Sequence, residues 1–219
     1  MTRLELIKKG GLKYTILAAI SFLVYVMGIV TIATPSERDL ALKATPIALV
    51  ISIAALLLFR EKRYSYKTLI VYSIIVILSW FMEAIGVNSG LIFGDYSYGN
   101  SLGFSIVGTP ILIGFNWLFL VIISQSITYF LRLKGVIAIV SSTLLMVYYD
   151  TLLEEVAPLM DMWEFTLPVV PISNYIGWFI IALVLNSLSY KIDREELNFM
   201  ALPLLILQII LFISILFIL

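Results

Sequence analysis

Residues 68–86 read TLIVYSIIVILSWFMEAIG, and this stretch decides the class of fold. It contains no Lys or Arg and is long enough to cross the ~30 Å hydrocarbon core of a bilayer as a helix. One carboxyl group, Glu83, nevertheless lies within it. Because an acid in hydrocarbon is costly to keep, such a group usually has a function. The stretch therefore predicts a membrane-spanning helix with a candidate site near one end.

Further apolar stretches surround this one. They lie at about 14–33, 46–59, 107–130, 136–153, 173–190 and 200–218. The second is short, and it can begin near Leu40 with Pro46 in its first turn. The chain is 62% hydrophobic and only 13% charged, whereas a soluble domain carries roughly 25% charged residues. We therefore predict an all-α polytopic membrane protein, a bundle of about seven transmembrane helices that forms a single domain over residues 1–219.

Lys and Arg gather on one side of these helices. Only Arg38 and Lys43 fall on the other side. The remaining basic residues are Arg3, Lys8, Lys9, Lys13, Arg60, Lys62, Arg63, Lys67, Arg132, Lys134, Lys191 and Arg194. Because cytoplasmic loops carry the excess of Lys and Arg, we predict a cytoplasmic N-terminus and an outside C-terminus. The protein would be a multi-pass protein of a bacterial inner or archaeal plasma membrane.

The residue types that are missing exclude several kinds of chemistry. The chain has no Cys and no His, which removes disulfides, thiolate nucleophiles and imidazole ligands for zinc or haem. We expect no metal site and no cofactor. The net charge is zero, so nothing favours nucleic acid as a partner. Retinal would need a Lys inside a helix, and the seventh stretch has none, which disfavours a photoreceptor or pump.

Acidic residues supply the candidate chemistry. Tyr72, Ser79 and Glu83 share one face of the third helix, and Asp150 and Glu154 share one face of the fifth. Like charges four residues apart repel, so in an apolar site at least one of this pair holds its proton at neutral pH and can donate it. The alternatives are polar packing between helices and, for Glu154, a solvated helix end.

The loop after Glu83 reads AIGVNSGLIFGDYSYGNSLG. Its glycines permit tight turns, and Asp95 stands beside Tyr96 and Tyr98. This composition suits a loop folded back over a pocket, although such aromatic residues also anchor helices among lipid headgroups.

The fourth and sixth helices carry amide and indole side chains in their outer halves, on the same side of the membrane as the loop after Glu83. These residues are Asn116, Trp117, Asn174 and Trp178. The alternatives are that the Asn residues only join helices and that the Trp residues belong to an interfacial belt. We expect a pocket in the outer halves of the third to sixth helices. The inner halves, and the first, second and seventh helices, should be nearly bare of buried polar groups.

Carboxylic acids beside Trp, Tyr and Asn, without His or Cys, suit acid catalysis on an alkene. A carboxylic acid protonates the double bond, and aromatic faces stabilise the resulting cation by ~0.5–2 kcal/mol each. A second carboxylate or an Asn then positions the water that captures it. An alkene substrate would be lipid-soluble, which explains a site built inside a membrane.

Four runs of this sequence resemble the membrane carotenoid-biosynthesis family, which includes the bisanhydrobacterioruberin and γ-carotene/lycopene hydratases. In order, they are MEAIGVNSGLIFGDYSYG, VGTPILIGFNW, YYDTLLEEVAPLMDMWEF and VPISNYIGW. The resemblance implies that water adds across the terminal double bond of an acyclic carotenoid end without a cofactor. The family pattern corresponds here to Glu83, Gly94, Tyr96, Tyr98, Pro110, Trp117, Asp150, Trp163, Asn174, Gly177 and Trp178.

The sequence departs from the family pattern at one place. The family tends to have an Asp-Pro pair soon after the acid of the fifth helix. Here Ala157 precedes Pro158, which leaves Glu154 or Glu155 to stand in for that acid.

We therefore hypothesise a carotenoid hydratase in which Asp150 or Glu83 donates the proton and the other orients water. Glu154 and Asp95 are further catalytic candidates. The proposed substrate-binding residues are Tyr96, Tyr98, Asn116, Trp117, Trp163, Asn174 and Trp178. Membrane lipid and other enzymes of the carotenoid pathway are candidate partners. The alternatives are a carotenoid end-group cyclase or isomerase, which shares the protonation step, and a small transporter or non-catalytic assembly partner.

Overall fold

The computed structural model describes residues 11–60, 63–193 and 197–219. Within these ranges, seven helices are long and apolar enough to cross a membrane, which confirms the predicted all-α polytopic fold. They are α2 (Gly11–Ala33), α3 (Arg38–Leu58), α4 (Tyr66–Ser89), α5 (Ile111–Phe130), α6 (Gly135–Val156), α7 (Ile172–Asp193) and α8 (Ala201–Ile218). A short 3₁₀ turn, η1 (Pro35–Glu37), joins α2 to α3.

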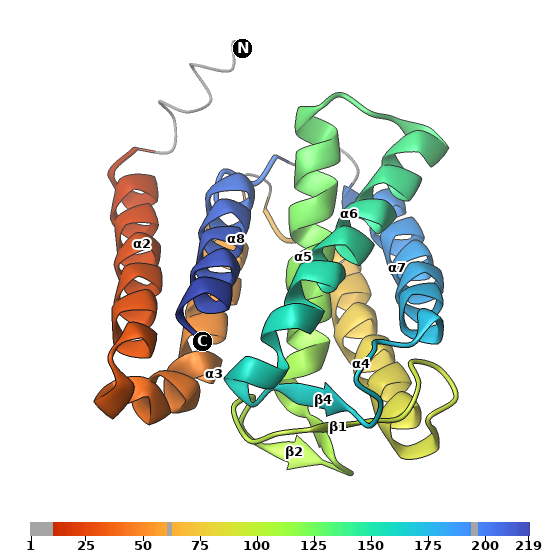
Figure 1. The fold of residues 1–219 in the computed structure, drawn as a ribbon. Helices are drawn as coiled ribbons and strands as arrows, with labels where there is room; N and C mark the ends of the chain where they lie inside the picture. The colour runs from red at the N-terminus through yellow and green to blue at the C-terminus, as the bar shows by residue number, and fades with distance from the viewer. Residues whose placement is uncertain (1–10, 61–62, 194–196) are drawn as a thin grey trace.

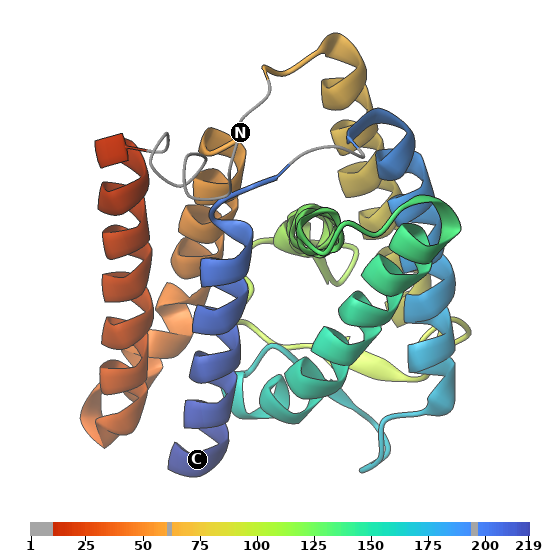
Figure 2. The same ribbon diagram turned by 90° about the horizontal axis from the view of Figure 1, so that it is seen from above.

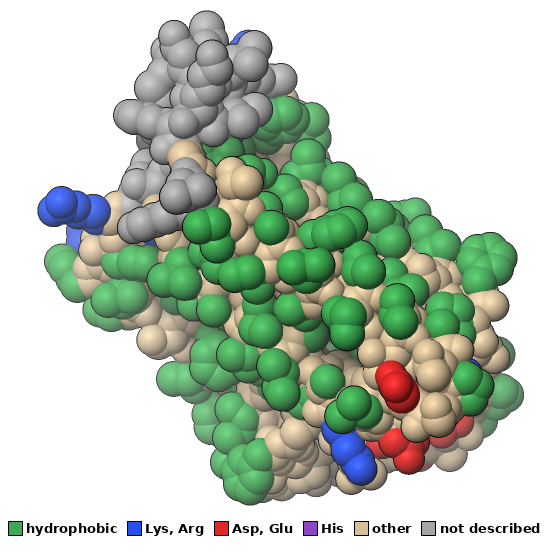
Figure 3. All heavy atoms as spheres, turned by 90° about the vertical axis from the view of Figure 1, so that its left-hand side faces the viewer, with side chains coloured by type: hydrophobic (Ala, Val, Ile, Leu, Met, Phe, Trp, Pro, Cys, Tyr) green, Lys and Arg blue, Asp and Glu red, His purple; other side chains and the backbone are tan. Residues whose placement is uncertain are grey.

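Helix α5 stands in the middle of the bundle. Helices α2, α3 and α8 lie on one side of it, and α4, α6 and α7 lie on the other (Figures 1 and 2). Most of α5 is buried, whereas α2 exposes large apolar side chains such as Phe22 and Met27. Hydrophobic side chains also cover most of the face shown in Figure 3, with charged side chains near its margins. Such a surface suits hydrocarbon rather than water.

A close approach between α4 and α5 depends on a glycine. A Cβ atom at Gly114 would lie only 2.5 Å from the carbonyl oxygen of Val76, so only glycine lets the two helices pack at this distance. The same two helices carry Glu83 (α4) and Trp117 (α5), which are joined by a hydrogen bond. The contact therefore helps to position the site described below.

Four short strands lie at one end of the bundle, which we call the strand end. Strand β1 (Tyr96–Tyr98) pairs antiparallel with β4 (Trp163–Phe165), with Tyr96 opposite Phe165 and Tyr98 opposite Trp163. Strands β2 (Ser105–Ile106) and β3 (Thr109–Pro110) form a second pair, and a 3₁₀ turn, η2 (Pro158–Met160), precedes β4. The pairing of β1 with β4 joins the loop after α4 to the loop after α6.

Two details of the expected helix starts were wrong. Helix α3 begins at Arg38, close to the expected start near Leu40, but Pro46 lies well inside it rather than in its first turn. A membrane helix tolerates this loss of one N–H donor when its neighbours compensate. Helix α5 begins at Ile111 rather than at residue 107, because residues 109–110 belong to β3 and Pro110 is the N-cap.

The predicted orientation in the membrane stays a prediction. Several of the basic residues on which it depends lie outside the described residues, namely Arg3, Lys8, Lys9, Lys62 and Arg194. Arg60, Arg132 and Lys134 follow the ends of α3 and α5 that lie away from the strands. The strand end is therefore the end that the charge distribution predicts to face outside.

Candidate active site

Glu83 is the centre of one hydrogen-bonded group at the strand end. Its side chain is 4% exposed. The hydroxyls of Tyr96 and Tyr98 both donate to Oε2 at 2.7 Å, and the indole nitrogen of Trp117 donates to Oε1 at 2.8 Å. Three donors on one carboxyl group hold Glu83 in place as a hydrogen-bond acceptor.

The two tyrosines reach Glu83 because β1 folds back over the helix ends. The predicted loop over a pocket is thus seen in the contacts of Tyr96 and Tyr98. Burial, and after it the negative charge of Glu83, raise the pKa of both phenols well above the ordinary value. Both hydroxyls therefore keep their protons and remain donors.

Asp150 and Glu154 form a second group, one helical turn apart on α6. The side-chain amide of Asn174 on α7 donates to Asp150 Oδ2 at 3.0 Å and to Glu154 Oε1 at 2.9 Å. The indole nitrogen of Trp163 on β4 donates to Glu154 Oε2 at 2.8 Å. Glu154 is 5% exposed and Asp150 is fully buried, so Glu154 is not a solvated helix end, whereas its neighbour Glu155 is exposed.

One oxygen in this group differs from all the others. Asp150 Oδ1 is buried and has no hydrogen-bond partner among the described residues. Every other carboxyl oxygen of Glu83, Asp150 and Glu154 accepts at least one hydrogen bond. A buried oxygen without a hydrogen-bond partner costs about 1–3 kcal/mol, and the cost is larger when the carboxyl group is charged.

A small cavity connects the two groups. Glu83 and Glu154 both line it, together with Tyr96, Tyr98, Trp163, Asn174 and Trp178. Trp178 stacks on Trp117 with ring centroids 3.9 Å apart and planes 20° apart. The cavity volume is only about 10 Å³, about the space that one water molecule needs. Asn174 and Trp178, four residues apart on α7, both face this cavity.

Two predicted site residues lie elsewhere. Asp95 is exposed at the surface, because alternation along β1 turns the next residue, Tyr96, toward Glu83. The structure therefore does not bring Asp95 together with the other acids. Asn116 is 4% exposed but faces a different cavity, while its neighbour Trp117 contacts Glu83. Consecutive helical residues point about 100° apart.

Three apolar residues of this cavity were not singled out from the sequence. Phe93, Ile113 and Phe165 also line it. A period-two pattern was available as a signal, since Tyr96 and Tyr98 alternate with Ser97, and Trp163 and Phe165 alternate with Glu164. Two short strands could have been inferred from it, although not that they pair with each other.

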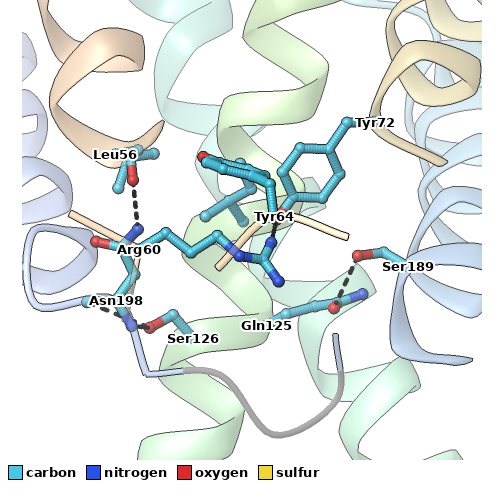
Figure 4. Close-up of a pocket in the computed structure, with 9 residues that line it drawn as sticks. Leu56, Arg60, Tyr64, Tyr72, Gln125, Ser126, Ser189 and Asn198 are labelled. Carbon is cyan, nitrogen blue, oxygen red and sulfur yellow. Dashed lines mark hydrogen bonds between the residues drawn. The ribbon is translucent and has the colours of Figure 1, made fainter. Parts of the chain in front are cut away.

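The expectation that the opposite end is nearly bare of buried polar groups was wrong. Gln125 on α5 donates to the backbone oxygen of Asn186 on α7 at 2.9 Å and accepts from Ser189 at 3.1 Å. The Ser126 hydroxyl donates to the backbone oxygen of Asn198 and accepts from its backbone N–H, and the Asn198 side-chain amide donates to the carbonyl of Leu56 (Figure 4).

Arg60 lies at the rim of this opposite cluster. Its guanidinium donates to the hydroxyl of Tyr72 at 2.9 Å and lies 4.9 Å from the ring centre of Tyr64 (Figure 4). The first, second and seventh spans hold buried polar groups too. Tyr25 and Ser52 are hydrogen-bonded, and Gln208 accepts from Tyr149.

The strand-end site can hold, donate and accept protons in an apolar setting. Neutral side chains donate all the hydrogen bonds to its acids that the described residues make. Among the residues that the structure describes, no group of His, Cys, Asp or Glu is arranged to hold a metal ion. The arrangement therefore suits proton transfer beside an aromatic wall.

The family model for carotenoid biosynthesis proteins matches residues 44–219. The chain therefore belongs to the carotenoid biosynthesis protein family, as its sequence motifs predicted. The match covers every element of the site and leaves α2 outside. No curated protein and no solved structure matches the chain.

Proposed function

We propose that this membrane protein is a carotenoid hydratase that adds water across the terminal double bond of an acyclic carotenoid end. The single observation that carries the proposal is the pair of acid groups, Glu83 on one side and Asp150 with Glu154 on the other, around a cavity walled by Trp and Tyr. Membership in the carotenoid biosynthesis family supplies the substrate class.

The Asp150–Glu154 pair is the proton donor in this proposal. Two carboxyl groups that share the Asn174 amide cannot both remain charged at low cost in an apolar site. The pair therefore holds one proton, and the bare Asp150 Oδ1 is its resting place. Glu154, which lines the cavity, passes the proton to the less substituted carbon of the double bond, and Asp150 replenishes it.

Protonation leaves a tertiary cation on the neighbouring carbon. The stacked Trp117 and Trp178 indoles, with Tyr96, Tyr98 and Trp163, stabilise this charge by ~0.5–2 kcal/mol for each ring. The Glu83 carboxylate adds electrostatic stabilisation from a fixed position.

Water then attacks the cation and forms the new carbon–oxygen bond. Its surplus proton returns to the carboxyl groups, so the acid is regenerated and the net reaction is alkene plus water to tertiary alcohol. The Asn174 amide lines the acid cavity and can hold this water, and Glu83 can accept its proton and pass it back to the Asp150–Glu154 pair. Such acid–base assistance typically contributes about 10²–10⁴-fold to the rate.

Expression in a lycopene-producing host tests the proposal. We expect a pigment that carries a tertiary hydroxyl, formed in the cell membrane fraction and detected by chromatography and mass spectrometry. Isotopically labelled water should leave its oxygen in the product. A cyclised or isomerised product without the label would replace the hydratase with a cyclase or isomerase. An unchanged pigment profile with lycopene and with monocyclic carotenes would contradict both activities.

A further inference from the structure

A second cavity lies beside the acid site and has nearly apolar walls. It lies between α2, α3, α5, α6 and α8, and its volume is about 70 Å³, against about 10 Å³ at the acids. Its lining includes Tyr25, Ala48, Leu49, Leu153, Leu211 and Phe212. We call it the apolar chamber. A cavity walled by apolar side chains stays dry and accepts apolar ligands.

The apolar chamber and the acid cavity share part of their walls. Ile113 of α5 and Trp163 of β4 line both. The indole nitrogen of Trp163 is bonded to Glu154. The acid cavity has space for about one water molecule, so the hydrocarbon of a substrate that reaches the acids must lie in adjoining space. The apolar chamber is such a space.

One polar side chain in the chamber is unsatisfied. Asn116 is 4% exposed and lines the chamber, but its amide makes no hydrogen bond to any described residue. The other polar groups of the wall are paired, since Tyr149 donates to Gln208 and Tyr25 bonds Ser52. A buried amide without a partner usually meets water or a ligand. Its position suits an otherwise apolar molecule that gains one oxygen.

We propose that the apolar chamber binds the linear isoprenoid chain next to the reacting double bond, with the Trp163 indole marking the boundary between chain and acids. This inference rests on the proposed hydratase function. It makes α2 part of the substrate site through Tyr25, although α2 lies outside the residues that the family model matches. It also assigns the Asn116 amide to the hydroxylated product, which it can hydrogen-bond, rather than to the substrate.

Chain binding can be measured without turnover. Purified protein in lipid nanodiscs is titrated with lycopene, and quenching of Trp fluorescence reports binding because Trp163 borders the chamber. Ala48→Phe fills the chamber from α3, and Val50→Phe is the matched control because Val50 is 53% exposed on the same helix. We expect about tenfold weaker binding for Ala48→Phe and a change within about twofold for Val50→Phe. Equal binding by Ala48→Phe and wild type would overturn the proposal.

Two further measurements separate this inference from the hydratase itself. Asp150→Asn should bind lycopene as wild type does, because it changes the acid and not the chamber. If Ala48→Phe still binds and hydrates, the chamber proposal fails and the hydratase stands. If no variant hydrates but binding stays sensitive to Ala48→Phe, the chamber stands and the hydratase fails.

Photoaffinity labelling tests the chamber in the wild-type protein, so its result does not depend on whether Ala48→Phe folds. A linear isoprenoid that carries a diazirine is photolysed with the wild-type protein, and labelled peptides are mapped. Label on residues that line the chamber, such as Leu211 and Phe212 of α8, supports the proposal. Label confined to lipid-facing residues such as Phe22 and Met27 of α2 overturns it.

Discussion

The bundle has a buried polar cluster at each end, and the two are built from different side chains. At the strand end, neutral donors surround three acids. At the opposite end, amides and hydroxyls of Gln125, Asn186 and Ser189 bond one another. Neutral pairs of this kind join helices in a membrane. Buried acids in the same setting are costly to keep because they can be charged, and such groups usually have a function. Burial of polar groups alone therefore does not mark a site, but burial of titratable ones does.

The largest effect should come from removing the proton of the Asp150–Glu154 pair. Asp150→Asn, Glu154→Gln and the double variant should each lower the yield of hydrated carotenoid by about 10²–10⁴-fold. If the pair shares one proton, as proposed, the double variant should lose little more than either single one. The measurement is product per amount of membrane-inserted protein. Full additivity of the two losses would contradict a shared proton.

Glu83→Gln should come next, with a loss of about 10²–10³-fold in product. The change removes a charge but keeps the hydrogen bonds, because the hydroxyls of Tyr96 and Tyr98 can accept from an amide nitrogen while Trp117 donates to the amide oxygen. The thermal unfolding midpoint should therefore change little. Wild-type yield from this variant would show that the Glu83 charge has no part in catalysis.

Trp178→Leu should have an intermediate effect. It removes the ring stacked on Trp117, and a loss of ~0.5–2 kcal/mol of cation stabilisation corresponds to about 2–30-fold in rate. Phe22→Leu, on the exposed face of α2, is the matched control and should leave the product yield unchanged. Equal yields from the two variants would contradict an aromatic cation site.

Gln125→Leu should affect stability and not catalysis. The amide links α5 to α7, and its loss should cost about 1 kcal/mol and lower the unfolding midpoint by about 2–4 °C. Ser214→Leu, where the hydroxyl bonds only within α8, should leave the midpoint unchanged. A loss of product per folded protein in Gln125→Leu would mean that the opposite cluster also takes part in the reaction.

Asp95→Asn should have the smallest effect. The side chain is exposed, and its main described role is a backbone bond from Thr166 to its carbonyl oxygen, which the change preserves. Product yield should stay within about twofold of wild type. A loss comparable to that of Glu83→Gln would return Asp95 to the catalytic group.

The helices and most of the site residues were predictable because each rests on local chemistry. A run of apolar residues must be helical in hydrocarbon, and an acid inside such a run stands out in the sequence. The spacing of Asp150 and Glu154 placed both on one face. Tyr96 and Tyr98 were predictable as loop residues over a pocket from the composition around them.

The remaining features depend on contacts between distant segments. The register of β1 against β4 joins residues almost seventy positions apart, and no local pattern fixes it. The direction in which Asn116 points follows from the rotation of α5, which is set by packing at Gly114. Gln125 and Asn186 were visible as polar residues in apolar runs, but only the tertiary structure shows that they meet.

The central position of α5 has a mechanical consequence. This helix supplies Trp117 to the bonds around Glu83 and Gln125 to the bonds with Asn186, so it is fastened at both of its ends. Sliding it along its axis would strain both attachments at once. A route by which the proposed carotenoid substrate enters from the lipid should therefore open through the outlying helices or the connecting segments, while α5 stays in place.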